Sequence, residues 1–217
     1  MISIAIDGPS GSGKSTISKE AAQKLGFLHI DTGALYRAIA YFVFENKIPL
    51  DKVSEALNKI NIDPKFQDGH QLVFLNKKDV SGKIRTPEIS SLASQVSKIK
   101  EVRKFLLETQ RNLAEKNNVI MDGRDIGTTV LPNANVKIFL TASSETRARR
   151  RYLQLLESGI DCDYSEILEK VIERDNQDIN REISPLKKAD DAILLDTSNL
   201  TFSESIDKII EIIKSNL

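Results

Sequence analysis

The sequence predicts an α/β fold in three layers, with a five-stranded parallel sheet covered by helices on both faces. Five short apolar runs, at residues 2–7, 27–30, 118–122, 136–141 and 192–196, have the length and composition of buried strands. Helical patterns alternate with these runs, and such alternation is typical of parallel strands joined by crossover helices. A chain of 217 residues is long enough to bury one such core with insertions.

Charge and cysteine content restrict the classes of function. The 31 basic and 31 acidic residues cancel, so nothing global predicts a nucleic-acid or membrane partner. The single cysteine, Cys162, excludes an intramolecular disulfide, and two distant histidines, His29 and His70, disfavour a zinc site. No apolar stretch is long enough to span a membrane, and the chain begins with its first strand rather than a signal peptide. We therefore expect a soluble cytoplasmic protein.

A glycine-rich loop joins the first strand to the first helix. Residues 8–15 match Gly-x-x-x-x-Gly-Lys-[Ser/Thr], in the strand–loop–helix context that this pattern requires. Glycines let the backbone turn tightly, so that successive N–H groups converge on an anion beside the positive end of the helix dipole. Lys14 can reach the β- and γ-phosphates of a nucleotide, and the Ser15 hydroxyl can ligate Mg²⁺.

This stretch resembles the nucleotide-binding loop of the P-loop proteins. The resemblance predicts binding of a nucleoside triphosphate, with Mg²⁺ held by Ser15 together with the nucleotide phosphates. A glycine-rich turn without a ligand is the simpler alternative, which the flanking strand and helix disfavour. The predicted ATP-binding residues are Gly8, Pro9, Ser10, Gly11, Ser12, Gly13, Lys14, Ser15 and Thr16.

The second strand leads from one predicted helix into another. After the first helix, over residues 14–25, the strand contains His29, which we expect to have no chemical role. Asp31 or Thr32 can then cap the next helix. Ligands of open parallel sheets bind beyond the carboxyl ends of the strands, so residues 31–37 should lie close to the glycine-rich loop.

The start of that next helix carries a specific pattern, Asp-Thr-Gly-Ala-Leu-Tyr-Arg, at residues 31–37. Alone, the pattern is a capped helix start with a solvated arginine. After a P-loop, Asp-[Ser/Thr]-Gly-x-x-Tyr-Arg resembles the nucleoside-monophosphate kinases, and the cytidylate kinases in particular. The resemblance implies that Arg37 holds the acceptor monophosphate and that Thr32 and Tyr36 line its site.

Residues 64–86 predict a small β-rich insertion between two helices. A strand-like run at 71–75 is followed by Asn-Lys-Lys-Asp at 76–79, which matches the guanine-reading Asn-Lys-x-Asp of GTPases. A GTPase needs an Asp-x-x-Gly element before that motif, whereas the match at 79–82 overlaps its end. We therefore interpret the run as a hairpin turn. Residues 80–86 again resemble the insertion of bacterial-type cytidylate kinases.

Residues 88–116 should be mostly helical, in two or more segments. Within them, Ser94 and Arg103 would by themselves be ordinary helix residues. The resemblance implies that both line a pyrimidine pocket. Cytosine presents an amino donor beside acceptor atoms, so a pocket that reads it needs at least one acceptor and one donor. The wrong base would leave buried polar groups unpaired, which makes such a pocket selective.

The third strand ends in Asp-Gly-Arg-Asp-Ile-Gly-Thr at residues 122–128, the most family-specific run in the chain. Two carboxylates and an arginine this close together must be paired or contact a ligand if they are buried. A strand-end aspartate often only caps a turn, but Asp122 would also suit an indirect contact with Mg²⁺. The resemblance places Asp122 in the substrate site, Arg124 on phosphate and Asp125 on the cytosine amino group.

An arginine-rich helix follows the fourth strand. Ser143 or Ser144 can cap it, and Arg147 and Arg151 share one of its faces. A solvated basic face is the ordinary alternative. However, arginines without an acidic partner on the same segment repel one another unless an anion arrives, and phosphoryl transfer needs arginines around the moving group. Residues 143–182 therefore predict a helical hairpin that could close as a lid.

The second half of this hairpin places three charged residues on one helix face. These are Arg174, Asp178 and Arg181. An exposed salt bridge within a helix would contribute only about 0.3–0.5 kcal/mol. The resemblance implies instead that Arg174 and Arg181 bind phosphates and that Asp178 binds the acceptor ribose.

The motifs divide the chain into three regions. A last helix, over about 203–215, is assigned to packing alone, with Phe202 and four isoleucines as its buried stripe. The predicted regions are a P-loop core at 1–31, 117–142 and 183–217, a monophosphate-binding region at 32–116 and a lid at 143–182.

The resemblance to cytidylate kinases covers nearly the whole chain, with five motif blocks in family order. It implies transfer of the γ-phosphoryl group of ATP to CMP, and to dCMP as a second acceptor, with Mg²⁺ and by a monomer. The implied catalytic residues are Lys14, Arg124, Arg147, Arg151 and Arg174. The implied substrate-binding residues are Thr32, Tyr36, Arg37, Ser94, Arg103, Asp122, Arg124, Asp125, Arg174, Asp178 and Arg181.

Three alternatives remain open on sequence alone. The nearest is a related kinase that acts on UMP, AMP or shikimate. A GTPase-like switch is a second alternative, which the motif order disfavours. The third is a nucleotide-binding structural or regulatory module without turnover. The clustered acceptor-side arginines weigh against this module, because a sensor needs no second phosphate site.

Overall fold

The computed structural model of the chain describes residues 1–67 and 69–217. Within them, no helix is both long and apolar enough to cross a bilayer. The strands are β1 (Ser3–Asp7), β2 (Leu28–Asp31), β3 (Ile62–Gln67), β4 (His70–Leu75), β5 (Lys78–Asp79), β6 (Val119–Gly123), β7 (Val136–Thr141) and β8 (Ile193–Asp196). The helices are α1 (Lys14–Leu25), α2 (Thr32–Glu45), α3 (Val53–Ala56), α4 (Pro87–Val96), α5 (Lys100–Lys116), α6 (Ser144–Glu157), α7 (Tyr164–Asn180) and α8 (Phe202–Ser215), with short helical turns η1 (Leu50–Lys52), η2 (Leu57–Lys59) and η3 (Ile126–Val130).

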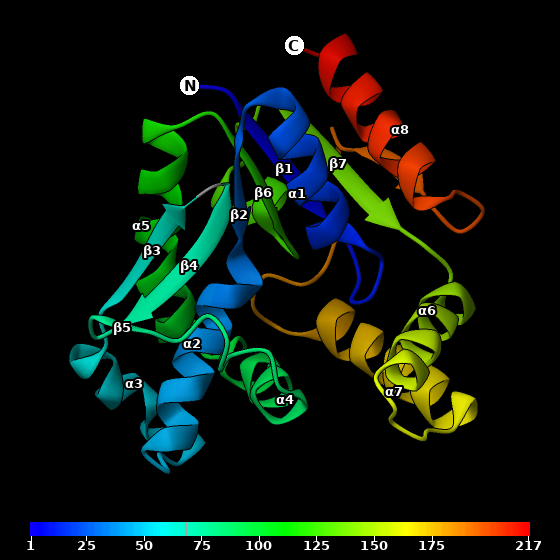
Figure 1. Cartoon of the computed structure of the whole chain (residues 1–217). Helices are drawn as coiled ribbons and strands as arrows, with labels where there is room; N and C mark the ends of the chain where they lie inside the picture. The colour runs from blue at the N-terminus through cyan, green and yellow to red at the C-terminus, as the bar shows by residue number, and fades with distance from the viewer. Residues whose placement is uncertain (68) are drawn as a thin grey trace.

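The predicted five-stranded parallel sheet is confirmed. Its strand order is β2-β6-β1-β7-β8, so β1 is central and pairs with β6 on one side and β7 on the other. All neighbouring strands of this sheet are parallel. Their carboxyl ends therefore share one edge, which faces the lower half of the molecule in Figure 1.

Alternate residues of the central strand face opposite helical layers. Ile4 and Ile6 belong to a buried cluster with residues of α1 and α8. Ala5 belongs to a second cluster with residues of α5 and η3. The sheet is therefore buried on both faces, and the predicted three-layer α/β/α architecture is confirmed (Figure 1).

The last helix differs from the prediction at its first turn. The four isoleucines of its stripe pack against the sheet, but Phe202 is 51% exposed. A capping box determines the start of α8, because the Thr201 side chain accepts from the N–H of Glu204 and the Glu204 carboxylate accepts from the N–H of Thr201. Local hydrogen bonds, rather than burial of the aromatic ring, define where this helix begins.

The β-rich insertion is an antiparallel sheet in the order β3-β4-β5. The strand-like run at 71–75 and the turn after it were predicted and are confirmed as β4 and its hairpin turn, whereas β3 was not predicted. Pro64 argues against a strand, yet β3 is an edge strand, where proline is tolerated. Asn76 and Lys77 have positive φ angles of 48° and 67°, so the Asn-Lys-Lys-Asp run forms the predicted hairpin turn.

Two groups of helices flank the carboxyl edge of the main sheet. α4 and α5 are the two predicted helical segments, and they pack with α2 around buried residues that include Leu35, Val96 and Leu106. On the other side, α6 and α7 form a hairpin, in which the rings of Tyr152 and Tyr164 meet edge to face with 6.1 Å between centroids. In Figure 1 this hairpin lies opposite α2 and α4.

Candidate active site

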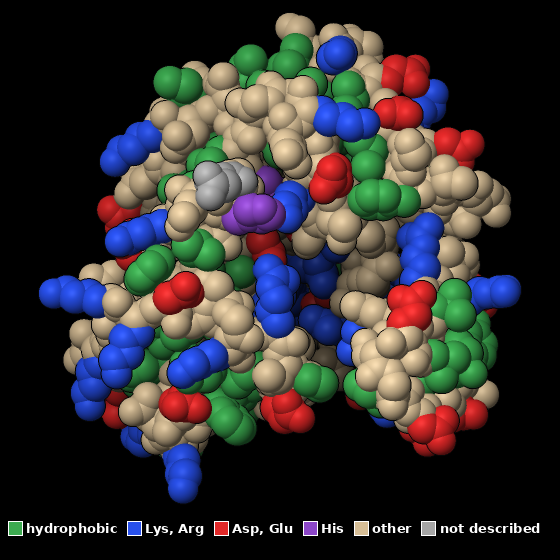
Figure 2. Space-filling view, in the orientation of Figure 1, with side chains coloured by type: hydrophobic (Ala, Val, Ile, Leu, Met, Phe, Trp, Pro, Cys, Tyr) green, Lys and Arg blue, Asp and Glu red, His purple; other side chains and the backbone are tan. Residues whose placement is uncertain are grey.

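The predicted site residues meet beyond the carboxyl edge of the parallel sheet, where a cavity of about 440 Å³ opens. Figure 2 shows the surface hollowed between the part that carries α2 and α4 and the α6–α7 hairpin, with basic and acidic side chains inside the hollow. All of the implied substrate-binding residues line this cavity: Thr32, Tyr36, Arg37, Ser94, Arg103, Asp122, Arg124, Asp125, Arg174, Asp178 and Arg181.

The glycine-rich loop forms one wall of the cavity. A Cβ on Gly8 would lie 1.9 Å from the Leu140 carbonyl oxygen of β7, so only glycine fits there. Gly13, with a left-handed φ of 88°, turns the chain into α1, whose first N–H groups receive no side-chain cap from the described residues. The loop residues that line the cavity are Ser10, Gly11, Gly13, Lys14, Ser15 and Thr16, and Gly8, Pro9 and Ser12 are buried behind them.

Lys14 is buried in this wall, and its Nζ donates to the Pro9 carbonyl oxygen at 2.7 Å. Burial, and next the repulsion from Arg124, lower the pKa of Lys14 to about 7. The surroundings therefore hold less negative charge than a buried ammonium group requires. An anion bound against the loop would supply that charge, as the glycine-rich pattern predicts.

Ser15 and Asp122 form an oxygen-rich pair below the loop. The Ser15 hydroxyl donates to Asp122 Oδ2 at 2.7 Å. Burial acts to raise the pKa of Asp122, but hydrogen bonds from His29 and Ser15 and the charges around it bring that pKa below its ordinary value. Hydroxyl and carboxylate oxygens suit Mg²⁺, which needs few protein ligands when it binds with nucleotide phosphates. The pair therefore fits a divalent metal that arrives with a nucleotide.

His29 is a residue of this site that sequence analysis missed. It lies in β2 as predicted, but its Nε2 is 2.7 Å from Asp122 Oδ1, so its side chain contacts a residue of the site. The signal was in the strand register. Asp31 pairs with Asp122 across β2 and β6, and His29 precedes Asp31 by two residues, so both side chains occupy the same face of the sheet.

The start of α2 carries the first part of the acceptor side. Asp31 caps the helix as predicted, with Oδ1 accepting from the Ala34 N–H at 3.0 Å. Its Oδ2 accepts from Arg37 at 2.7 Å and from Arg85 at 3.3 Å. Arg85 also lines the cavity, although sequence analysis gave it no role. Its only signal was its position at the end of the β-rich insertion.

Three guanidinium groups in the cavity wall have buried N–H donors without an acceptor. Within the described residues, Arg37 Nε, Arg174 Nε and Arg181 Nη2 lack a hydrogen-bond partner. Burial, followed by repulsion from neighbouring arginines, lowers the pKa of both Arg174 and Arg181. Because buried donors are almost always satisfied in proteins, these groups indicate a site for an anionic, oxygen-rich ligand.

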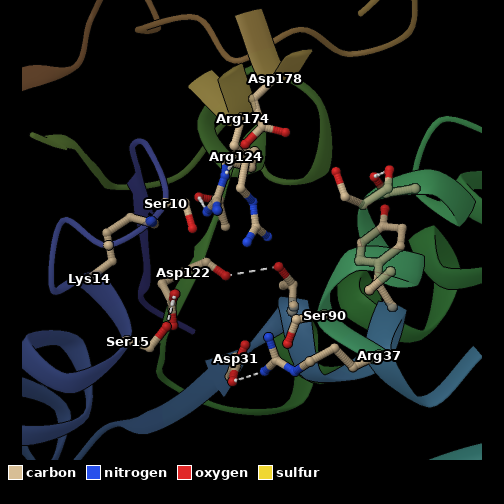
Figure 3. Close-up of a pocket in the computed structure, with 18 of the residues that line it drawn as sticks. Ser10, Lys14, Ser15, Asp31, Arg37, Ser90, Asp122, Arg124, Arg174 and Asp178 are labelled. Carbon is tan, nitrogen blue, oxygen red and sulfur yellow. Dashed lines mark hydrogen bonds and ion pairs between the residues drawn. The ribbon is translucent and has the colours of Figure 1, made fainter. Parts of the chain in front are cut away.

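Arg124 crosses the cavity toward α7. Its Nε donates to Asp178 Oδ2 at 2.9 Å. Burial acts to raise the pKa of Asp178, but the charge and hydrogen bond of Arg124 and two further arginines lower it overall, so this carboxyl group is ionised. Figure 3 shows Arg124 and Arg174 pointing into the space beside Asp122, with Asp31 and Arg37 across it.

Arg103 and Asp125 form a buried pair in the wall of the same cavity. Arg103 Nη2 hydrogen-bonds Asp125 Oδ2, and Arg181 Nη2 lies 3.7 Å from the other carboxylate oxygen. The Arg103 guanidinium also lies 5.5 Å from the centre of the Tyr36 ring. Ser94 lines the same cavity. The pair therefore offers one strong donor and one strong acceptor side by side, with an aromatic face next to them.

The structure does not bring the two predicted lid arginines, Arg147 and Arg151, into the cavity wall. Arg147 is buried, and it donates to the Ser10 carbonyl oxygen of the glycine-rich loop and to Asp175 of α7, at 2.9 Å each. Asp175 is the acidic partner that the arginine-rich run at 147–151 lacks. Arg151 is exposed and donates to Gln154 at 2.8 Å.

Comparison with known proteins identifies the family. The family model for cytidylate kinase matches residues 4–215. The chain belongs to the cytidylate kinase family. Curated cytidylate kinases from Caldicellulosiruptor bescii and Lactobacillus johnsonii are 54% and 52% identical to it, over 97% and 99% of this chain and 95% and 94% of theirs. The protein is therefore an ATP-dependent nucleoside-monophosphate kinase, and the predicted resemblance is confirmed.

Solved structures support the same fold at low sequence identity. An uncharacterized protein from Eubacterium ventriosum has a TM-score of 0.56 at 15% identity, with 99% of each chain covered. A shikimate kinase from Bacteroides thetaiotaomicron has a TM-score of 0.50 at 13% identity, with 98% of each chain covered. These likenesses show the fold that this cytidylate kinase family member shares with P-loop kinases. They show the fold alone, so the acceptor substrate has to be inferred from the residues that line this cavity.

Proposed function

We propose that this kinase transfers the γ-phosphoryl group of ATP to CMP, giving ADP and CDP, and that dCMP is a second acceptor. The buried Arg103–Asp125 pair carries the proposal, because it provides one donor and one acceptor in the wall of a cavity that the P-loop also lines. The names of the curated relatives support the same substrate. The donor and acceptor nucleotides then meet in the middle of the cavity, near Arg124.

The donor half of the site holds the triphosphate. Backbone N–H groups of the glycine-rich loop and the start of α1 surround the phosphates, and Lys14 Nζ moves from the Pro9 carbonyl to a phosphate oxygen. Ser15 would hold Mg²⁺, with Asp122 behind it. When bound, Mg²⁺ would supply positive charge that neutralises the phosphates. The protein itself contributes alignment and fixed positive charge.

The acceptor half holds the monophosphate between arginines. Arg37, Arg124, Arg174 and Arg181 surround the predicted phosphate position, and the unpaired donors of three of them supply hydrogen bonds. Asp178, held by Arg124, accepts from ribose hydroxyl groups. Phosphoryl transfer needs little covalent help from a protein, so these cations act by aligning the two phosphates and stabilising the transferring group.

The base is read at Arg103 and Asp125. Asp125 accepts from the exocyclic amino group of cytosine, and Arg103 donates to its ring nitrogen or carbonyl oxygen. Uracil presents a carbonyl oxygen where cytosine has its amino group, and this oxygen would face the Asp125 carboxylate without a proton between them. A buried mismatch of this kind disfavours UMP as an acceptor.

Closure of the α6–α7 hairpin completes the site in this proposal. We place the P-loop core at 1–31, 117–142 and 183–217, the monophosphate-binding region at 32–116 and the lid at 143–182. Arg147 and Arg151 come from the lid and approach the transferring group only after closure. Closure also excludes water, which would otherwise accept the phosphoryl group. A monomer in the cytoplasm, independent of nucleic acid and membrane, is sufficient for this chemistry.

An acceptor panel tests the proposed function. ADP release from ATP and Mg²⁺ would be followed with CMP, dCMP, UMP, AMP, GMP and shikimate, and without an acceptor. We expect strong turnover with CMP and dCMP, weak turnover with UMP and little with the others. Preferred use of a purine nucleotide or shikimate would overturn the substrate, and release independent of any acceptor would overturn the transferase mechanism.

A further inference from the structure

His29 contacts the active site from outside the cavity. It is buried in β2, does not line the cavity and lies behind Asp122 as seen from the nucleotide site. Its Nε2 is 2.7 Å from Asp122 Oδ1. At this distance the two atoms share a hydrogen bond, and because a carboxylate that accepts from Ser15 at Oδ2 also accepts at Oδ1, the proton of this bond lies on the histidine Nε2.

Asp122 therefore receives one hydrogen bond on each oxygen. His29 donates to Oδ1, and the Ser15 hydroxyl donates to Oδ2, both at 2.7 Å. The two donors come from different elements, β2 and the first turn of α1, which packs against β2 and β6. The carboxylate is thus clamped between the central sheet and the start of the P-loop helix.

This clamp determines where the oxygen lone pairs of Ser15 point. A serine hydroxyl has one proton and two acceptor lone pairs, and the bond to Asp122 directs the proton away from the phosphate site. The terminal torsion of an aspartate is soft, so one bond leaves the carboxylate free to rotate. Asp122 is only 3% exposed, and solvent therefore cannot replace a lost donor at Oδ1.

We infer that His29 is a positioning residue for the metal-bound donor nucleotide. It fixes Asp122, and through Asp122 it fixes the Ser15 hydroxyl, in the orientation that presents an oxygen lone pair to Mg²⁺ bound with ATP. The inference rests on the proposed use of Mg²⁺ and ATP. It does not depend on the acceptor, because His29 reaches Ser15 through Asp122 and does not line the cavity that would hold the acceptor.

Three substitutions separate this role from simple packing. His29→Phe keeps a ring of similar size but removes the N–H donor, and His29→Gln restores a side-chain N–H at a similar reach. His70→Phe is the matched control, since His70 is the other histidine and lies exposed on β4. Each purified variant is first checked for an unchanged thermal unfolding transition.

Binding of ATP is then measured by calorimetry without acceptor, once with Mg²⁺ and once with EDTA. His29→Phe should weaken binding in Mg²⁺ about tenfold while binding in EDTA changes less than about twofold. His29→Gln should recover most of the loss, and His70→Phe should match the wild type. Equal losses with and without the metal, or no loss at all, would overturn the inference.

A measurement on the unmodified chain covers the case in which His29→Phe does not fold. Histidine ring nitrogens labelled with ¹⁵N give signals from two residues only, which His70→Phe assigns. The His29 signal should shift on addition of ATP with Mg²⁺ and stay in place with ATP and EDTA. An unresponsive signal contradicts the inference, whereas a failed acceptor panel would contradict the proposed substrate and leave His29 untouched.

Discussion

At the scale of a single residue, Asp7 connects the strand before the glycine-rich loop with the segment that carries Asp125. It ends β1, directly before the glycine-rich loop, and its two carboxylate oxygens accept from the N–H groups of Ile126 and Gly127 at 2.7 Å each. These residues follow Asp125 in the chain. The strand that leads into the P-loop therefore also holds the segment that presents the base-reading carboxylate.

The titration of Asp7 predicts a pH dependence of stability. Burial raises the pKa of Asp7 from 3.8 to about 6, against the two backbone hydrogen bonds, which lower it. A raised carboxyl pKa contributes stability that is complete below pH 3.8 and is lost as the pH rises through 6. Between pH 4.5 and 7.5 this loss amounts to about 2 kcal/mol.

Asp7→Asn removes the titrating carboxyl group. Comparing the wild type with this variant at each pH therefore isolates the effect of Asp7. The lowered pKa values of Asp122 and Asp178 make stability rise with pH, but they act equally in both proteins. The variant should be less stable than the wild type in urea unfolding. We expect the gap between the two to be larger at pH 4.5 than at pH 7.5, by about 2 kcal/mol. A gap that is constant, or that widens toward pH 7.5, would show that Asp7 does not titrate in this way.

Lys14 should matter for activity and hardly at all for stability. Burial and Arg124 disfavour the ammonium form of Lys14 in the folded protein, so removing this charge does not lower the free energy of unfolding. Lys14→Ala should lower kcat by about 10³-fold, because the triphosphate loses a fixed cation. Its melting temperature should stay close to that of the wild type.

The matched control is Lys24→Ala, at the other end of α1, where the lysine is exposed and, among the residues that the structure describes, forms one ion pair, with Asp207 at 3.6 Å. This variant should keep full activity. Near-normal turnover of Lys14→Ala would contradict the assignment of the P-loop.

At the scale of elements, the P-loop and the two lid helices are joined by one buried arginine. Arg147 links the Ser10 carbonyl oxygen with Asp175, so α6, α7 and the glycine-rich loop share a contact. Removing one partner of a buried ion pair leaves an uncompensated charge. Asp175→Ala should therefore lower the free energy of unfolding by about 3 kcal/mol, measured in urea.

Glu173→Ala provides the control for that experiment. Glu173 lies on the same helix, is exposed and accepts from Gln177, one turn away. Its substitution should cost less than about 0.5 kcal/mol. Equal effects of the two substitutions would mean that the Arg147–Asp175 pair does not hold α7 against the P-loop.

Elements with a clear hydrophobic pattern could be predicted from the sequence alone. The fourth apolar run was expected at 136–141 and is observed as β7 at Val136–Thr141. β3 was missed because Pro64 and alternating charged residues obscure a short edge strand. The turn η3 was missed because it follows no periodic pattern and is held by Asp7, which is remote in the sequence.

At the scale of the whole molecule, the site exists because remote segments end at the same edge of one sheet. Residues 31–37 were predicted from that rule to lie close to the glycine-rich loop, and the structure brings Asp31 and Lys14 to the same cavity. The roles of Arg85 and Asp175 could not be predicted in this way. Each depends on a partner from another element, and neither spacing nor residue type reveals such a partner.

The central claim is that the cavity selects cytosine through Asp125. The most direct test is the ratio of kcat/KM for CMP to kcat/KM for UMP, in the wild type and in Asp125→Asn. An asparagine can donate to the uracil carbonyl that a carboxylate repels, so the ratio should fall by at least about tenfold. In the control, Asp178→Asn, both values should fall together, because Asp178 is assigned to the ribose. An unchanged ratio in Asp125→Asn would contradict the account.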